Sequence, residues 1–83
     1  MKILINNEEE SVQVQKALLS LGYEWNHNGK KVIGFVFYPR IFDCTANKIS
    51  TLQSNDRTAI KPVVFLRRAK LARVKNLIKS NDN

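Results

Sequence analysis

The chain has 83 residues, of which 43% are hydrophobic and 25% charged, and its formal net charge is +7. These ordinary globular values argue against a disordered basic tail and predict one domain over residues 1–83, with a frayed tail over 80–83. Cys44 is the sole cysteine, which excludes an intramolecular disulfide and suits a reducing compartment, so we expect a cytoplasmic protein. No apolar run approaches the ~20 residues that span a bilayer, and the N-terminus turns acidic where a signal peptide stays apolar, so we expect neither membrane insertion nor secretion.

The first third of the chain predicts a strand followed by a helix. The strand is the apolar run Lys2–Ile5, and Asn7 can cap a helix whose first turn carries three glutamates. Apolar residues then recur at helical spacing at Val14, Ala17, Leu18 and Leu21. Gly22 follows, where we expect it to end the helix.

The middle of the chain is rich in β-formers and predicts strands joined by turns. We expect strands at Tyr23–Asn26, Lys31–Tyr38, Arg40–Cys44 and Lys48–Leu52, with turns at His27–Lys30 and Thr45–Asn47. Because Pro39 interrupts the pattern, Arg40–Cys44 is either a continuation of the preceding strand after a bulge or a strand of its own.

The last third predicts an edge strand at Pro62–Phe65 and a helix from about Leu66 to Lys79. The apolar residues that we expect on the buried stripe of this helix are Leu71, Val74, Leu77 and Ile78. The order βαββ(β)βα predicts an α+β fold, a small antiparallel sheet with an N-terminal helix and a basic C-terminal helix.

The charge is concentrated near the C-terminal end. Between Arg57 and Lys79 there are eight basic residues and no acid. Crowding of like charge costs self-repulsion, which a polyanionic partner relieves, so the run favours nucleic acid over a merely solvated helix face. The residues that we expect to contact phosphates are Lys30, Lys31, Arg40, Lys61, Arg67, Arg68, Lys70, Arg73, Lys75 and Lys79.

A helical wheel places these cations on both sides of the expected apolar stripe. Arg68, Lys75 and Lys79 fall on one shoulder, and Lys70 and Arg73 on the other. If five such charges each neutralise a phosphate, the logarithm of the binding constant should fall with the logarithm of salt concentration at a slope of about −3.5 to −4.5. Alternatively, the long stems could snorkel over a hydrophobic rim.

Other chemistry has little support in the residues. His27 and Cys44 cannot supply the four ligands of a structural zinc, and no glycine-rich phosphate loop is present, so we expect no metal and no cofactor. We expect most aromatic residues in the core, with Trp25 or Tyr38 as the alternative base-stacking platforms. Catalysis could be built around His27 alone, but no second acid or base is evident, so we expect no enzyme.

Four short segments carry a resemblance to a known group. Residues 3–11 and 14–25 combine a strand, an acidic-capped helix containing Glu-Ser and a Leu-Gly-Tyr-x-Trp exit, and Tyr38–Asp43 and Asn47–Ile49 suit the hairpin that follows. This pattern resembles small accessory proteins of tailed phages of the T-even type. Among basic phage proteins of this size, inhibitors of ToxIN-type toxin–antitoxin ribonucleases are the group that the resemblance implies, with an RNA-binding surface and the toxin as partner.

A second resemblance competes with the first. Leu18–Trp25 followed by His27 is similar to the helix, glycine, aromatic strand and histidine order of HicA-type mRNA interferases. In those toxins the histidine follows a Gly-Ser at a strand entry, whereas here His27 precedes Asn28 and Gly29 in a turn, so the catalytic role does not carry over.

The sequence therefore predicts a phage-encoded, non-enzymatic RNA-binding protein that counters a host antiviral ribonuclease in the host cytoplasm, with little sequence specificity. The alternatives are a HicA-like mRNA interferase and a protein–protein inhibitor whose basic face docks on an acidic host protein.

Overall fold

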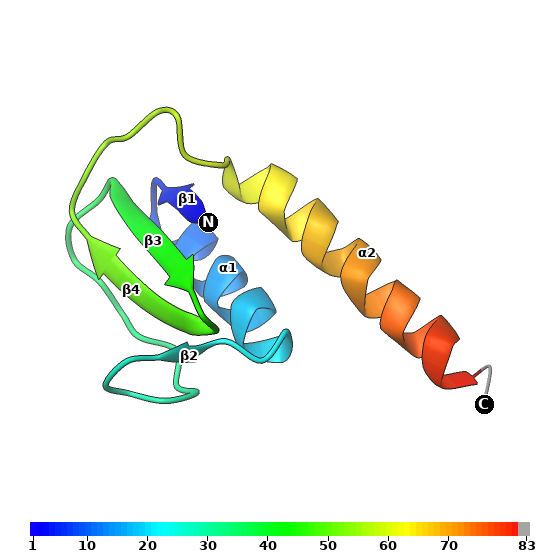
Figure 1. Cartoon of the computed structure of the whole chain (residues 1–83). Coiled ribbons are helices and arrows are strands. Elements are labelled where there is room, and N and C mark those ends of the chain that lie inside the picture. The colour runs from blue at the N-terminus through cyan, green and yellow to red at the C-terminus, as the bar shows by residue number, and fades with distance from the viewer. Residues whose placement is uncertain (82–83) are drawn as a thin grey trace.

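The computed structural model of the chain describes the backbone of residues 1–81 and the side chains of residues 1–74. Across that part the elements follow in the order β1 (Lys2–Ile5), α1 (Glu8–Ser20), β2 (Glu24–Trp25), β3 (Arg40–Thr45), β4 (Lys48–Leu52) and α2 (Pro62–Asn81). The predicted α+β class is confirmed (Figure 1). Of the expected frayed tail, Ser80 and Asn81 belong to α2, and the last two residues lie outside the described part.

The sheet is mixed, whereas the sequence predicted an antiparallel one. Its strand order is β1-β3-β4-β2, with β3 antiparallel to both β1 and β4. The edge strand β2 runs parallel to β4 through the pairs Glu24 with Lys48 and Trp25 with Ile49. Helix α1 covers one face of the sheet, and α2 runs past α1 and projects beyond it (Figure 1).

Local signals position the first helix and the β3–β4 hairpin as expected. The Asn7 side chain accepts a hydrogen bond from the Glu10 backbone nitrogen at 2.9 Å and caps α1. At the other end of α1, Gly22 has φ of +96°, a conformation that side chains disfavour. Ala46 and Asn47 both have positive φ and form the tight turn between β3 and β4.

The predicted strand Lys31–Tyr38 is wrong. This segment is a loop without ladder pairing. The bridge between Trp25 and Gly29 and a hydrogen bond from the Lys31 nitrogen to the Asn28 carbonyl, at 3.5 Å, close the turn before it. The loop instead packs Ile33, Phe35 and Tyr38 against the core. Burial of these side chains stabilises the segment without a strand partner, which is why its β-rich composition misled the prediction.

The predicted edge strand Pro62–Phe65 is wrong as well, because α2 begins at Pro62. The Lys61 carbonyl accepts a hydrogen bond from the Phe65 nitrogen at 3.1 Å, so Lys61 precedes the helix and Pro62 occupies its first position, where proline is favoured. Pairing with β1 is made earlier by Ile60, whose nitrogen donates to the Lys2 carbonyl at 2.8 Å.

The buried stripe of α2 also differs from the prediction. Phe65 and Ala69 are buried in the core cluster with Ala17 of α1, and the small alanines let the two helices approach closely. Leu71 and Val74 are instead 56% and 44% exposed, on the outer side of the helix. The side chains of Leu77 and Ile78, the other two residues of the predicted stripe, lie outside the described part.

Candidate nucleic-acid interface

Helix α2 presents exposed cations along its described length. We use the term α2 basic surface for Lys61, Arg67, Arg68, Lys70 and Arg73, all of which are exposed. No acidic residue occurs anywhere in α2. Among side chains of residues 1–74, the ion pair within 4 Å is that of Lys48 with Glu24, at 3.3 Å, and it lies between β4 and β2. Within that part of the chain, the α2 basic surface is therefore free to meet an external anion.

These cations surround the exposed part of the helix rather than forming one line. At about 100° per residue, the inward direction set by Phe65 and Ala69 leaves Arg68 on one flank and Lys70 on the other. Arg67 lies between them on the outer side. The predicted shoulders belonged to the stripe of Leu71 and Val74, which is exposed, so the described cations flank a different buried side from the one predicted.

A groove between the two helices adds a cation that the sequence analysis missed. Its volume is about 430 Å³, and it is lined by Gln13, Lys16 and Ala17 of α1 and by Leu66 and Arg73 of α2. The charged residues among these are both basic, so the groove suits a phosphate. Lys16 belongs to the acidic first third of the chain. Only the packing of α1 against α2 brings it into the same groove as Arg73, so the sequence contains no signal for this placement.

The other predicted cations lie elsewhere. Lys30 and Lys31 are exposed on the loop that follows β2, which Figure 1 shows on the far side of the molecule from α2. They do not extend the α2 basic surface. The side chains of Lys75 and Lys79 lie outside the described part.

The Arg40 side chain is held by contacts within the fold. Its guanidinium carbon lies 4.2 Å from the centre of the Phe35 ring, a cation–π contact. Its Nε donates to Thr51 Oγ1 at 3.1 Å, and its Nη1 donates to the Phe37 carbonyl at 3.0 Å. Arg40 therefore fastens the loop before β3 to β4, and its side chain has little freedom to reach a phosphate.

The exposed aromatic residue is Phe37 rather than either predicted platform. Trp25 exposes only 5% of its surface and packs edge-on against Phe42, and Tyr38 is half-buried. Phe37 is 64% exposed, next to Val36 at 85%. A strand would have placed Phe35 and Phe37 on one face, so the loop conformation was needed to separate the buried ring from the exposed one.

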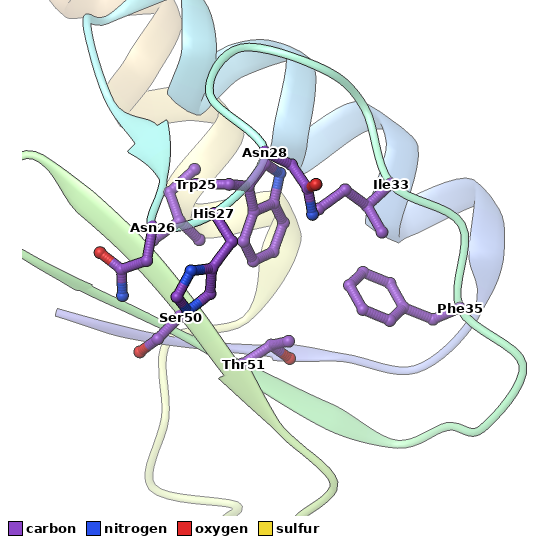
Figure 2. Close-up of a pocket in the computed structure, with 9 residues that line it drawn as sticks. Trp25, Asn26, His27, Asn28, Ile33, Phe35, Ser50 and Thr51 are labelled. Carbon is purple, nitrogen blue, oxygen red and sulfur yellow. The ribbon is translucent and has the colours of Figure 1, made fainter.

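His27 lies on the rim of a pocket beside β4 and has no acidic neighbour in its lining (Figure 2). Within the described residues, no three His, Cys, Asp or Glu side chains come close enough to hold a metal ion. In the same part of the chain, no helix combines the length and the apolar character that crossing a membrane takes.

Comparison with protein-family models, curated proteins and solved structures finds no match to this chain. The phage and HicA resemblances therefore stay predictions.

Proposed function

We propose that the chain is a non-enzymatic RNA-binding protein that holds the phosphate backbone through the α2 basic surface. The observation that supports this proposal is the exposed side of a helix without acids, whose described cations have no ion-pair partner within residues 1–74. Nothing in that geometry selects a base sequence, so we expect weak sequence preference and strong dependence on salt. A cytoplasmic location, which the single cysteine favours, and inhibition of a host ribonuclease, which the phage resemblance implies, are part of the proposal.

Fluorescence anisotropy with a labelled RNA oligonucleotide, repeated over a range of salt concentrations, tests the proposal. The test variant is Arg67→Gln with Lys70→Gln, since both residues are exposed on α2. The control is Lys2→Gln with Lys48→Gln, which removes the same net charge from exposed positions on β1 and β4. It also removes the exposed ion pair of Lys48 with Glu24, which contributes little to stability.

The test variant should bind more weakly, and its salt slope should be smaller in magnitude by about 1.4 to 1.8, whereas the control should keep the wild-type slope. Equal losses in both variants would show that net charge alone drives binding. Absence of RNA binding by the wild type at low salt would refute the proposal.

A second candidate function is docking on an acidic protein. Leu71 and Val74 are exposed beside Arg67 and Lys70, and apolar residues among cations suit a protein partner better than a phosphate backbone. Capture of such a partner that survives nuclease treatment and is lost in Leu71→Gln would favour this function.

A further inference from the structure

The groove between α1 and α2 brings hydrogen-bond donors from two helices to one place. The two helices lie side by side (Figure 1). Gln13 and Lys16 line the groove from α1, and Arg73 lines it from α2. All three side chains are exposed, and neither cation has an ion-pair partner within residues 1–74. The donors at this groove are therefore available to a ligand.

Helical spacing directs these residues to the same groove. Lys16 and Ala17 are three and four positions beyond Gln13, so the three residues lie on one side of α1. On α2, Leu66 and Arg73 are seven positions apart, which is about two turns, so they also share a side. Ala17 is buried and Leu66 is half-buried, so these two form an apolar floor beneath the longer polar side chains.

The charge of the lining determines which ligand the groove suits. Lys16 and Arg73 are both positive, and no acid is among the residues that line the groove. Two cations at one groove repel each other, and an anion between them adds two attractions. The Arg73 guanidinium offers a planar fork that matches a phosphate, Lys16 adds a point charge, and the Gln13 amide adds neutral donors. The lining therefore suits a phosphate group.

Glu9 restricts where along α1 a phosphate can lie. It is exposed one turn before Gln13 on the same side of the helix, and it does not line the groove. Its carboxylate repels a phosphate, whereas Lys16, about two turns further along, attracts one. An anion is therefore favoured at the end of the groove that carries Lys16 and Arg73.

We infer that this groove seats one backbone phosphate of a bound RNA strand, held jointly by Lys16 and Arg73, so that the strand crosses from α2 onto α1. The volume of about 430 Å³ is within the roughly 300–1,000 Å³ of small-molecule sites, so the sugars on either side of the phosphate also fit. The inference rests on the proposed RNA-binding function. It adds a contact from α1 and a fixed point on the path of the strand.

The salt dependence of RNA binding tests whether the two cations share one phosphate. Fluorescence anisotropy with the labelled RNA oligonucleotide should show a slope smaller in magnitude by about 0.7 to 0.9 in Lys16→Gln with Arg73→Gln, because one phosphate contact is lost. A fall of about 1.4 to 1.8, which we expect for Arg67→Gln with Lys70→Gln, would mean two separate phosphates and would overturn the shared site.

Single variants and a matched control separate the groove from net charge. Lys16→Gln leaves Arg73 at the phosphate, so binding should weaken by about threefold with little change in slope. The control is Lys2→Gln. Ile3 and Ile5 of β1 are buried, so the exposed Lys2 points to the opposite face of the sheet and should not affect binding. Equal weakening by Lys16→Gln and Lys2→Gln would reduce the effect to net charge and contradict the inference.

Nuclear magnetic resonance of the wild type identifies the ligand without relying on a variant that must bind. The Gln13 side-chain amide reports on the groove, and its resonance is assigned by its loss in Gln13→Ala. The probes are an RNA oligonucleotide with a 5′-hydroxyl, the same RNA with a 5′-phosphate, and inorganic phosphate at constant ionic strength. Both RNAs should shift the Gln13 amide to saturation at similar concentrations. A shift with the 5′-phosphorylated RNA alone, or with inorganic phosphate alone, would overturn the assignment to a backbone phosphate.

The outcomes distinguish this inference from the function proposed for α2. If the wild type binds RNA while the Gln13 amide stays unmoved and Lys16→Gln with Arg73→Gln keeps the full slope, the groove is overturned and RNA binding by α2 stands. If the groove variant loses slope while Arg67→Gln with Lys70→Gln does not, the groove is kept and the outer cations of α2 lose their assigned role.

Discussion

The Gln15 side chain of α1 holds Trp25 of β2 through the hydrogen bond from the indole nitrogen to its side-chain oxygen, at 3.2 Å. Gln15 is fully buried, and its amide nitrogen donates to Ser11 Oγ at 2.9 Å and to the Ile33 carbonyl at 2.7 Å. Since its oxygen also accepts from the Ile33 nitrogen, one side chain satisfies polar groups from three segments. Gln15 therefore joins α1, β2 and the loop before β3.

Replacing Gln15 with leucine should lower the free energy of unfolding by about 2–4 kcal/mol. The substitution leaves the Trp25 indole and both backbone groups of Ile33 without partners in a buried setting. Urea denaturation followed by circular dichroism measures the change. Gln13→Leu, at an exposed position on the same helix, should stay within about 0.5 kcal/mol, and equal effects of the two substitutions would contradict the role of the network.

Arg40→Lys should destabilise the fold by about 1–2 kcal/mol although the charge is kept. Lysine cannot lie flat on Phe35 while donating to Thr51 and to the Phe37 carbonyl. The control is Arg67→Lys on the outer side of α2, which should leave the denaturation midpoint unchanged. Because Arg40 is committed to the fold, its lysine variant should also keep the RNA salt slope of the wild type, and a reduced slope would count against this assignment.

The correctly predicted parts of the fold are those decided within a few residues. Asn7 and Glu10 cap α1 from three positions apart, and Ala46 and Asn47 form their turn by backbone conformation. The loop before β3 could not be predicted in this way, because its conformation depends on Gln15, eighteen positions away from Ile33. A β-rich composition cannot show that a helix side chain has replaced the strand partner.

The candidate site also has one part that the local sequence predicts and another part that depends on packing between distant segments. The acid-free run of cations can be counted in the sequence. The structure shows that Arg67, Arg68 and Lys70 of this run are exposed. Lys16 and Arg73 line the same groove because α1 packs against α2, and the pocket beside Trp25 also forms between segments that are distant in the sequence. No local sequence pattern could predict either feature.

The Cys44 thiol should make the free energy of unfolding depend on pH in the alkaline range. Burial raises the pKa of this thiol from its ordinary value of 9.0 to about 11. The folded state therefore keeps the proton that the unfolded state loses, so this contribution is fully present below pH 9 and is lost as the pH rises to about 11. The loss should amount to about 2–3 kcal/mol.

Urea denaturation of the wild type and Cys44→Ala at several pH values isolates the thiol, since lysines and tyrosines titrate in both proteins. The difference in unfolding free energy between the two should change between pH 8.5 and 11. A difference that stays constant with pH would show that the thiol is not buried in solution.

The orientation of α2 can be tested by comparing two large-to-small substitutions on its opposite sides. Phe65 is buried against the core, so Phe65→Ala should cost about 3–5 kcal/mol of unfolding free energy. Leu71 is 56% exposed, so Leu71→Ala should cost less than about 0.5 kcal/mol, with alanine's high helix propensity offsetting the lost contacts. Urea denaturation at low protein concentration measures both. If Leu71→Ala proved as costly as Phe65→Ala, the helix would be buried through the stripe that contains Leu71 and Val74, and the cations would lie on different sides from those described.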